Sequence, residues 1–187
     1  MAISTYVAVP TLAVGDKLTA TRWNTIVTAF SFLLDPPMCT ATNVAATSYA
    51  NNTRAVVPLA TEDADTGGSY DGAMHSTSSN NSRVIATTAG RYRLTARESW
   101  AANATGRRLL DVTKNTGGTF AAGSLVLSAA PAFTLTAADV CRVDAECELD
   151  LAANDYVEMW AYQTSGGNLA LDTAAGSNYL TLRLIGS

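Results

Sequence analysis

Residues 87–100 read Thr-Thr-Ala-Gly-Arg-Tyr-Arg-Leu-Thr-Ala-Arg-Glu-Ser-Trp, and this stretch decides the fold that we predict for the chain. After a turn at Ala89–Gly90, apolar and polar side chains alternate along it. The apolar set is Tyr92, Leu94 and Ala96, and the polar set is Arg91, Arg93, Thr95 and Arg97. Alternation with a period of two is typical of a β-strand that packs one face and exposes the other to water. Because strand-like segments lie on both sides of it, we predict an all-β protein.

Later stretches alternate in the same way. Apolar and charged residues alternate at every step in 141–151, and Leu180, Leu182 and Leu184 share one face of 179–185. Shorter strands are predicted at 42–49, 54–60, 82–86, 107–113, 125–128, 133–136 and 169–171. Pro58 places the segment 54–60 at a sheet edge, because proline cannot donate to a strand ladder. Roughly eight to ten short strands with one helix favour a jelly-roll β-sandwich.

The N-terminal segment has a different pattern. An irregular apolar stretch up to Val14 contains Pro10 and is predicted to be an extended arm, followed by a turn at 15–17. Residues 19–34 are predicted to form one amphipathic helix, with the hydroxyl of Thr19 as its N-terminal cap. The proline pair that begins at Pro36 ends the helix, because proline disfavours helical geometry in the residue before it.

Apolar residues of this helix recur with the spacing i, i+3, i+4 and i+7. They are Trp23, Ile26, Val27, Phe30, Leu33 and Leu34. One isolated helix cannot bury such a stripe, so it must dock on its own domain, on copies of itself or on another protein. We favour the last two and predict that the stripe anchors the protein in an assembly. The chain then divides into an N-terminal arm and anchor helix, residues 1–38, and a jelly-roll head, residues 39–187.

The composition narrows the function classes. Of the 187 residues, 48% are hydrophobic and 15% are charged, and the net charge is −4. An acidic chain of this kind is a poor candidate for binding nucleic acid. No secretory signal is visible, and no apolar run reaches the roughly 18 residues that a membrane span needs. We therefore expect a soluble protein that is made in a cytoplasm and does not insert into a membrane.

No catalytic site, metal site or cofactor is predicted. The acidic stretch 61–68 is expected to be a solvated loop, because its carboxylates lack the spacing of a calcium-binding loop. His75, the only histidine, lies in a polar loop over 70–81 and has no partnered nucleophile. It is expected to form hydrogen bonds within that loop, and we predict that the protein is not an enzyme.

The three cysteines are expected to be free thiols. Cys141 and Cys147 lie on one predicted strand, about 20 Å apart, which is beyond the reach of a disulfide. The sequence leaves open a bridge from Cys39 to either of them.

Two features indicate contacts beyond the core. Glu98 falls on the packed face of the strand at 90–100, where a carboxylate is costly unless it is paired. We expect it to mark a bulge, a strand end or a pairing at a subunit contact. His75 and Trp100 are candidate contacts for a ligand, since aromatic side chains on jelly rolls can stack on sugars.

The stretch 156–163 is apolar on both faces, which predicts a strand that is buried twice. Val157, Met159 and Ala161 are assigned to the core of one chain. The opposite face is predicted to form the contact between three copies of the chain. Its residues are Tyr156, Glu158, Trp160 and Tyr162.

Three segments resemble the jelly roll shared by complement globular heads and tumour necrosis factor. They are Ala89-Gly-Arg-Tyr-Arg-Leu94, Leu151-Ala-Ala-Asn-Asp-Tyr-Val-Glu-Met-Trp160 and Ser177-Asn-Tyr-Leu-Thr-Leu-Arg-Leu-Ile185. Asn154 stands where that family usually has glycine. The resemblance extends from residue 40 to residue 187 and implies a domain that forms threefold assemblies.

The front of the chain resembles small virion proteins of tailed phages. The matching segments are Val14-Gly-Asp-Lys-Leu-Thr-Ala-Thr-Arg-Trp-Asn24, Pro36-Pro37, Met74-His75, Asn81-Ser-Arg83 and Ala89-Gly90. This resemblance implies a structural protein of a bacteriophage, made in the host cytoplasm and placed on the virion surface as a homotrimer.

The partners implied by this resemblance are other copies of the chain and other virion proteins, either the major capsid protein or tail proteins. A short chain with one anchor helix favours decoration of the capsid. The alternative is a minor tail protein of the fibre or baseplate, whose head binds a host-surface glycan or receptor during host attachment.

Overall fold

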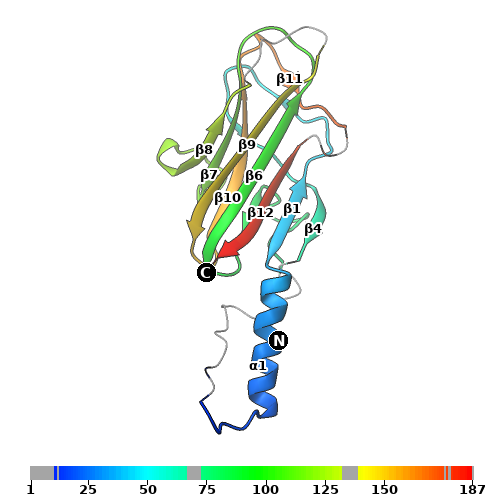
Figure 1. Ribbon diagram of the computed structural model, residues 1–187. Coiled ribbons are helices and arrows are strands. Elements are labelled where there is room, and N and C mark those ends of the chain that lie inside the picture. Colours follow the sequence, from blue (N-terminus) through cyan, green and yellow to red (C-terminus); the bar gives the residue numbers. More distant parts are fainter. Residues whose placement is uncertain are drawn as a thin grey trace.

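The computed structural model describes residues 11, 13–66, 73–131, 139–174, 176 and 178–186 of the chain. Its main body is a sandwich of two antiparallel sheets, and one helix projects from an end of that sandwich (Figure 1). The predicted all-β class is therefore confirmed, with one α-helix, near the N-terminus, among the described residues. The first ten residues of the predicted arm and the predicted strand at 133–136 lie outside the described residues.

The first sheet has five strands in the order β4-β1-β12-β6-β9. Their bounds are β4 Thr61–Asp65, β1 Met38–Thr42, β12 Tyr179–Gly186, β6 Gly90–Trp100 and β9 Cys141–Leu151. β6, which contains most of the stretch 87–100, pairs with β12 on one side and with β9 on the other. Its register with β9 is unbroken along all its residues. The strand predicted to organise the fold therefore lies inside the sheet.

The second sheet has the order β3-β10-β7-β8, and β5 also pairs with β10. Their bounds are β3 Ala55–Val56, β5 Arg83–Ile85, β7 Arg108–Lys114, β8 Leu125–Ala129 and β10 Tyr156–Gln163. A separate short pair joins β2, Ser48–Tyr49, to β11, Leu169–Ala170, and a single 3-10 turn, Ala122–Ser124, precedes β8. β3 lies at the edge of its sheet, which is the position that we predicted for the segment 54–60 from its proline, Pro58.

The hydrophobic core lies between the two sheets. From the first sheet it takes Tyr92, Leu94, Ala96, Trp100, Val143, Leu180, Leu182 and Leu184. From the second sheet it takes Val84, Leu110, Val112, Val157, Met159 and Ala161. These are the inward positions that the alternation predicted. Each large apolar side chain that is fully buried contributes about 1.5–3 kcal/mol relative to its exposed state, so this layer is the main stabilising element of the head.

The structure differs from the sequence prediction between residues 38 and 65. The first strand is β1, Met38–Thr42, rather than 42–49, and the acidic stretch predicted as a loop forms the edge strand β4. An edge strand tolerates this composition because the side chains of residues 61–63 remain exposed to water. The hydroxyls of Thr42 and Thr61 share a hydrogen bond of 2.5 Å across the two strands.

The helix α1 covers Ala20–Leu34, one residue shorter than predicted. The backbone N–H of Arg22 donates to the hydroxyl of Thr19 at 3.3 Å, which confirms Thr19 as the cap. At the N-terminal side, the predicted turn is present, with Gly15 at φ +92°. Arg22, the only charged residue within α1, pairs with Asp16 of that turn at 3.2 Å.

The junction between helix and head is fastened to the first sheet. The N–H of Leu184 in β12 donates to the carbonyl of Pro37 at 2.9 Å. The hydroxyl of Thr66, just after β4, donates to the carbonyl of Pro36 at 3.3 Å and accepts from the N–H of Met38 at 3.0 Å. Both neighbours of β1 therefore hold the point where α1 leaves the head.

We expect Gly106→Ala to destabilise the head strongly. Gly106 has φ +76°, and a Cβ placed there would lie 1.8 Å from the carbonyl oxygen of Thr164. Gly118 has the same φ, but a Cβ there would meet no atom within 4 Å, so Gly118→Ala is the matched control. Because the backbone strain is shared, the clash alone should make Gly106→Ala less stable than the control by about 2 kcal/mol or more in chemical unfolding. Equal stabilities of the two variants would contradict this contact.

Candidate functional site

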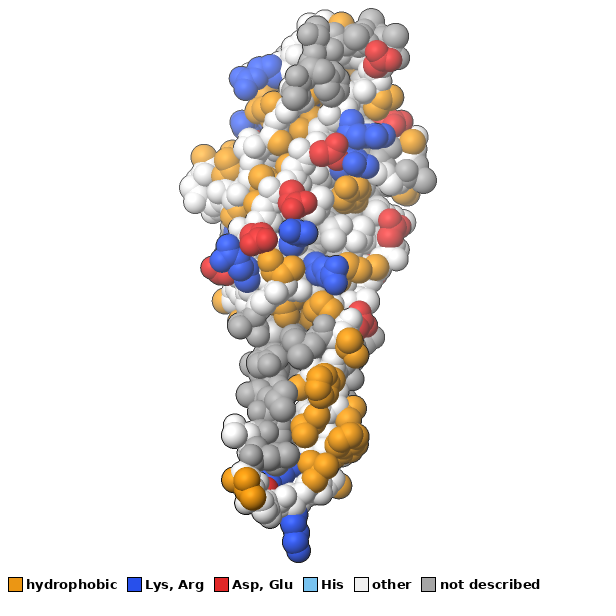
Figure 2. Space-filling view, in the orientation of Figure 1, with side chains coloured by type: hydrophobic (Ala, Val, Ile, Leu, Met, Phe, Trp, Pro, Cys, Tyr) orange, Lys and Arg blue, Asp and Glu red, His pale blue; other side chains and the backbone are white. Residues whose placement is uncertain are grey.

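The projecting helix exposes an apolar face. Figure 2 shows hydrophobic side chains gathered along it, apart from the mixed surface of the head. The exposed fractions are 54% for Trp23, 44% for Val27, 55% for Phe30 and 84% for Leu34. Ile26 of the predicted anchor stripe is half-buried, and the side chain of Leu33 is outside the described part. In the described part of the chain, no helix has both the length and the apolar character that crossing a bilayer requires.

The face of β10 that was predicted to join three copies is covered by the same chain. Glu158 at its centre is fully buried and accepts hydrogen bonds from side chains and backbone of neighbouring segments. The donors are Ser82 (3.2 Å), Arg83 (3.2 Å), Thr116 (2.6 Å) and the N–H of Gly118 (3.1 Å). The partners that the sequence argument required across a subunit contact therefore come from within one protomer.

The aromatic residues on this face are also covered. Trp160 is 3% exposed, its indole N–H donates to the hydroxyl of Thr113 at 2.7 Å, and its ring packs edge-on against Phe120. The guanidinium of Arg54 stacks on Phe120 and on Tyr162, with its Cζ 4.6 and 4.7 Å from the two ring centroids. The premise that these rings would be left in water is wrong for Trp160, which is buried, and Tyr162 is half-buried, because Phe120 and Arg54 from segments distant in sequence pack on them.

Tyr156, at the start of the same face, is held in a similar way. The guanidinium of Arg83 lies 4.4 Å from its ring centroid, and its hydroxyl accepts from the N–H of Gly117 at 2.8 Å. The turn at 115–118 thus closes over this end of β10. The sequence signal for this cover was Glu158 itself, since a carboxylate within an aromatic stripe requires several donors nearby.

His75 has the hydrogen-bonding role that we predicted for it, but it is not positioned to contact a ligand. Its side chain is fully buried, with Nδ1 2.8 Å from Glu62 and Nε2 3.1 Å from the carbonyl of Asn81. Asp65 accepts the backbone N–H groups of Met74 and His75 at 3.3 and 3.1 Å. Two acidic residues of β4 thus hold the loop, and within the described residues no group of three or more potential metal ligands is formed.

Trp100 is fully buried as well, so the prediction that it contacts a ligand is wrong for the folded chain. It lies in the core with its ring edge-on to Tyr49, at a centroid distance of 5.6 Å. Glu98, two residues earlier on the same face, is also fully buried. It marks neither a bulge nor a strand end, because its pairing with Val143 of β9 lies inside the continuous ladder.

Glu98 is an unpaired carboxyl group in the described part of the protein. Neither of its oxygens has a hydrogen-bond partner there. Burial raises the pKa of Glu98 well above its ordinary value; the indole of Trp100 opposes this shift and the charge of Asp111 adds to it. The hydroxyl of Tyr49 also lacks a partner, and its pKa is raised by burial and by the nearby Glu98. This end of the core therefore favours the protonated carboxyl.

The outer face of the first sheet carries the charged side chains that the alternation predicted. Arginines on β6 pair with acidic residues on β9: Arg91 with Glu148 at 3.1 Å, Arg93 with Glu146 at 3.4 Å, and Arg97 with Asp144. Their side chains are between 29% and 55% exposed. Pairs of this kind contribute about 0–1 kcal/mol each, so this face is a solvated surface rather than a stabilising core.

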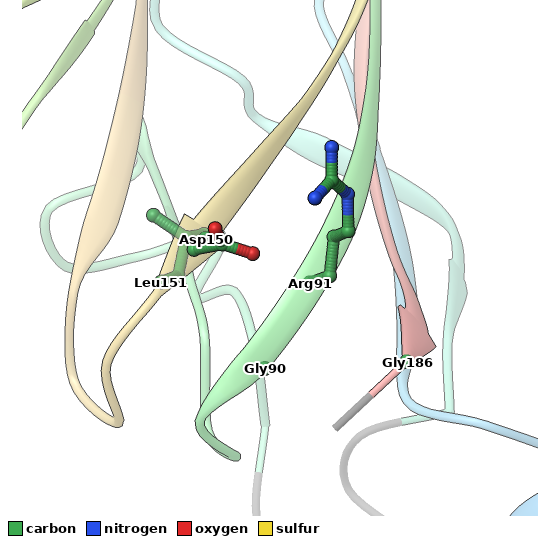
Figure 3. Close-up of a pocket in the computed structure, with 5 residues that line it drawn as sticks. All are labelled: Gly90, Arg91, Asp150, Leu151 and Gly186. Carbon is green, nitrogen blue, oxygen red and sulfur yellow. The ribbon is translucent and has the colours of Figure 1, made fainter.

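A shallow hollow lies at the end of the first sheet near the C-terminal end of β12 (Figure 3). Gly90, Arg91, Asp150, Leu151 and Gly186 line it. Gly90 is required there, since a Cβ would come within 2.4 Å of the carbonyl oxygen of Gly186. Arg91 pairs with Glu148 rather than with Asp150, and the lining groups form no arrangement to which we can assign a reaction.

The cysteines are free, as expected, and the bridge left open for Cys39 is not formed. Cys39 and Cys141 are buried and Cys147 is half-buried. Burial, together with the charges of Asp65 and Glu62, raises the pKa of the Cys39 thiol. The thiol therefore stays protonated and behaves as a small apolar group of the core.

Comparison with known proteins supports the fold and no closer relationship. No protein-family model and no curated protein matches the chain. Among solved structures, murine APRIL at pH 5.0 has 11% identity and a TM-score of 0.56, and the alignment covers 79% of this chain and 98% of APRIL. The Eiger TNF from S. frugiperda has 10% identity and a TM-score of 0.54, over 81% of this chain and 95% of Eiger.

The globular domain of zebrafish complement 1qA aligns with 14% identity and a TM-score of 0.47, over 80% of this chain and 97% of that domain. The fold likeness therefore rests on APRIL and on the Eiger TNF, whose TM-scores are above 0.5. The predicted jelly-roll β-sandwich is confirmed, and at these identities the likeness extends to the fold alone.

Glu98→Gln should change the pH dependence of stability. The pKa of Glu98 in the folded protein lies above the ordinary value of 4.5, so the folded state keeps a proton that the unfolded chain releases. The stability that this group contributes is therefore present at low pH and is lost as the pH rises above the ordinary value. The loss amounts to up to about 1.4 kcal/mol per pH unit until the folded-state pKa is reached.

The variant lacks this titration, so its stability relative to the native protein should increase as the pH rises above the ordinary value of 4.5 in chemical unfolding. Glu148→Gln is the control, because the Glu148 side chain is 41% exposed. Parallel stability curves for the native protein and Glu98→Gln would show that the carboxyl is not perturbed.

Proposed function

We propose that the protein is a non-enzymatic structural component of a phage particle, a homotrimeric surface projection that decorates the capsid and is held by its N-terminal segment. The observation that carries this proposal is the helix that projects from one end of the head with an exposed apolar face (Figures 1 and 2). A folded protein rarely leaves an apolar patch of this kind in water unless a partner covers it.

The separation of the helix from the core of the head supports the same proposal. The head, from residue 39 onward, has its own core, and none of the described residues before residue 39 belongs to the core cluster. The junction is fastened through Pro36 and Pro37 to the two strands that flank β1. A fixed junction gives the helix a defined direction relative to the head, as a surface projection requires.

The proposal of three copies rests on the resemblance of the sequence to jelly rolls that form threefold assemblies. A threefold rotation also forms a closed ring, in which every contact surface is occupied. We do not place the contact between heads at Tyr156, Glu158, Trp160 and Tyr162, because Glu158 and Trp160 are buried within one chain and the two tyrosines are half-buried beside its arginines. The alternative, a tail protein with a glycan-binding head, gains no support from His75 or Trp100, since both side chains are buried.

Native mass spectrometry of the full chain tests the oligomeric state. The expected species has three times the mass of the chain at micromolar concentration, and a spectrum that contains only monomer would contradict the proposal.

Immunogold labelling of intact virions tests the location. We expect label on the capsid, while label on the tail would favour the alternative. Particles without label would contradict a virion protein of either kind.

Removing residues 1–35 should separate the head from its attachment. This truncation keeps Pro36 and Pro37, whose carbonyls accept hydrogen bonds from the head. We expect the melting temperature of the jelly roll to stay within about 4 °C of the full chain, the size of shift that corresponds to about 1 kcal/mol or less. The truncated head should no longer join particles in a complementation assay. Normal incorporation of the truncated head would show that the anchor lies elsewhere.

A further inference from the structure

The exposed residues of α1 have the spacing of a helix that packs against copies of itself. From Trp23 to Val27, Phe30 and Leu34, the steps are four, three and four residues. This is the alternation of core positions in a heptad repeat, with Val27 and Leu34 at position a and Trp23 and Phe30 at position d. These four residues are exposed in the structure. Their spacing is therefore independent of the alternation that places strand residues in the core of the head.

We propose that α1 packs in parallel against α1 of two further copies and forms a three-helix stalk beneath the heads, an inference that rests on the proposed homotrimer. We name the four residues at 23, 27, 30 and 34 the seam. Position g beside the seam is also apolar in this assignment, with Ile26 and Leu33. Apolar residues at a, d and g make a face wider than the seam of a two-stranded coiled coil, which suits a bundle of helices.

The lack of charged side chains along the exposed face of the helix favours an identical partner. From residue 23 to residue 34 the helix has no charged side chain, and Arg22 is already paired with Asp16. Three copies can therefore approach without repulsion between like charges. The stripe has no charge that could pair with an opposite charge on a different protein, whereas an identical stripe matches it in spacing and in chemistry.

The fixed junction sets the direction. Since Pro36 and Pro37 hold the helix to β12 and to the end of β4, each copy sends its helix away from its head in the same way. Copies related by a rotation axis along the helices then place them parallel and in register, so that position 27 of one copy faces position 27 of the next. The helix has 15 residues, a length that is marginal for an isolated helix in water, so the stalk depends on the heads that it joins.

Disulfide trapping in the full chain tests the register. Val27→Cys should give chains that cross-link through this position under mild oxidation, because a-position residues meet at the axis of a parallel bundle. Thr21→Cys is the matched control, since Thr21 is exposed on the opposite side of the helix. Two of the native cysteines are buried and one is half-buried. The cross-linking of the native protein is therefore measured first and subtracted. Cross-linking of Val27→Cys that does not exceed that of Thr21→Cys would overturn the proposal.

A charge in the seam gives an independent measurement. Val27→Asp should raise the concentration at which the trimer dissociates by about 100-fold or more, because three carboxylates would be buried together. Thr21→Asp should change it less than about threefold, within the range of an exposed substitution. Each variant is followed by native mass spectrometry and by far-ultraviolet circular dichroism of the folded head.

The outcomes separate this inference from the proposed function. A native protein that is monomeric would contradict both. A native trimer that Val27→Asp leaves intact would overturn the stalk and retain the homotrimer. If Val27→Asp remains trimeric but no longer joins particles, the seam binds another virion protein, and the stalk of identical helices is again overturned.

Discussion

The exclusion of water from the space between the two sheets is the constraint on which the rest of the structure depends. β6 lies inside the first sheet, and every second side chain from Tyr92 to Trp100 points into that space. Glu98 shows how strict the constraint is. Positions 96 and 100 both point inward, so the alternation of a strand also turns the side chain at position 98 away from the solvent-exposed face. The carboxyl is not hydrated there, and burial raises its pKa.

Strands with one environment on each face were predictable from the sequence, and this includes β6, β9 and β12. β10 was predictable on one face only. Val157, Met159 and Ala161 are in the core as expected, but the opposite face is covered by Phe120 and Arg54. Contacts between segments so distant in sequence have no period, so a pattern along one strand cannot reveal them. The edge strand β4 was missed for a related reason, since its acidic composition resembles that of a loop, and the contacts of Glu62 and Asp65 with His75 join segments about ten residues apart.

The helix shows what sequence and structure each contribute to the candidate site. The cap at Thr19, the end before Pro36 and the six-residue apolar stripe were all visible in the sequence. A stripe alone does not say which of its residues the head leaves uncovered. The structure distinguishes Trp23, Val27, Phe30 and Leu34 from the half-buried Ile26, and this exposed subset has the alternating spacing of a heptad repeat.

The placement of β1 has a mechanical consequence. β1 continues directly from the helix and lies between β4 and β12, both antiparallel to it. A pull transmitted through the helix would act along β1 and load the hydrogen bonds of both ladders together, in shear. Strands pulled from a sheet end one hydrogen bond at a time separate at much lower force than strands sheared along their length. A head tethered in this way would resist being torn from its support even where each ladder is short.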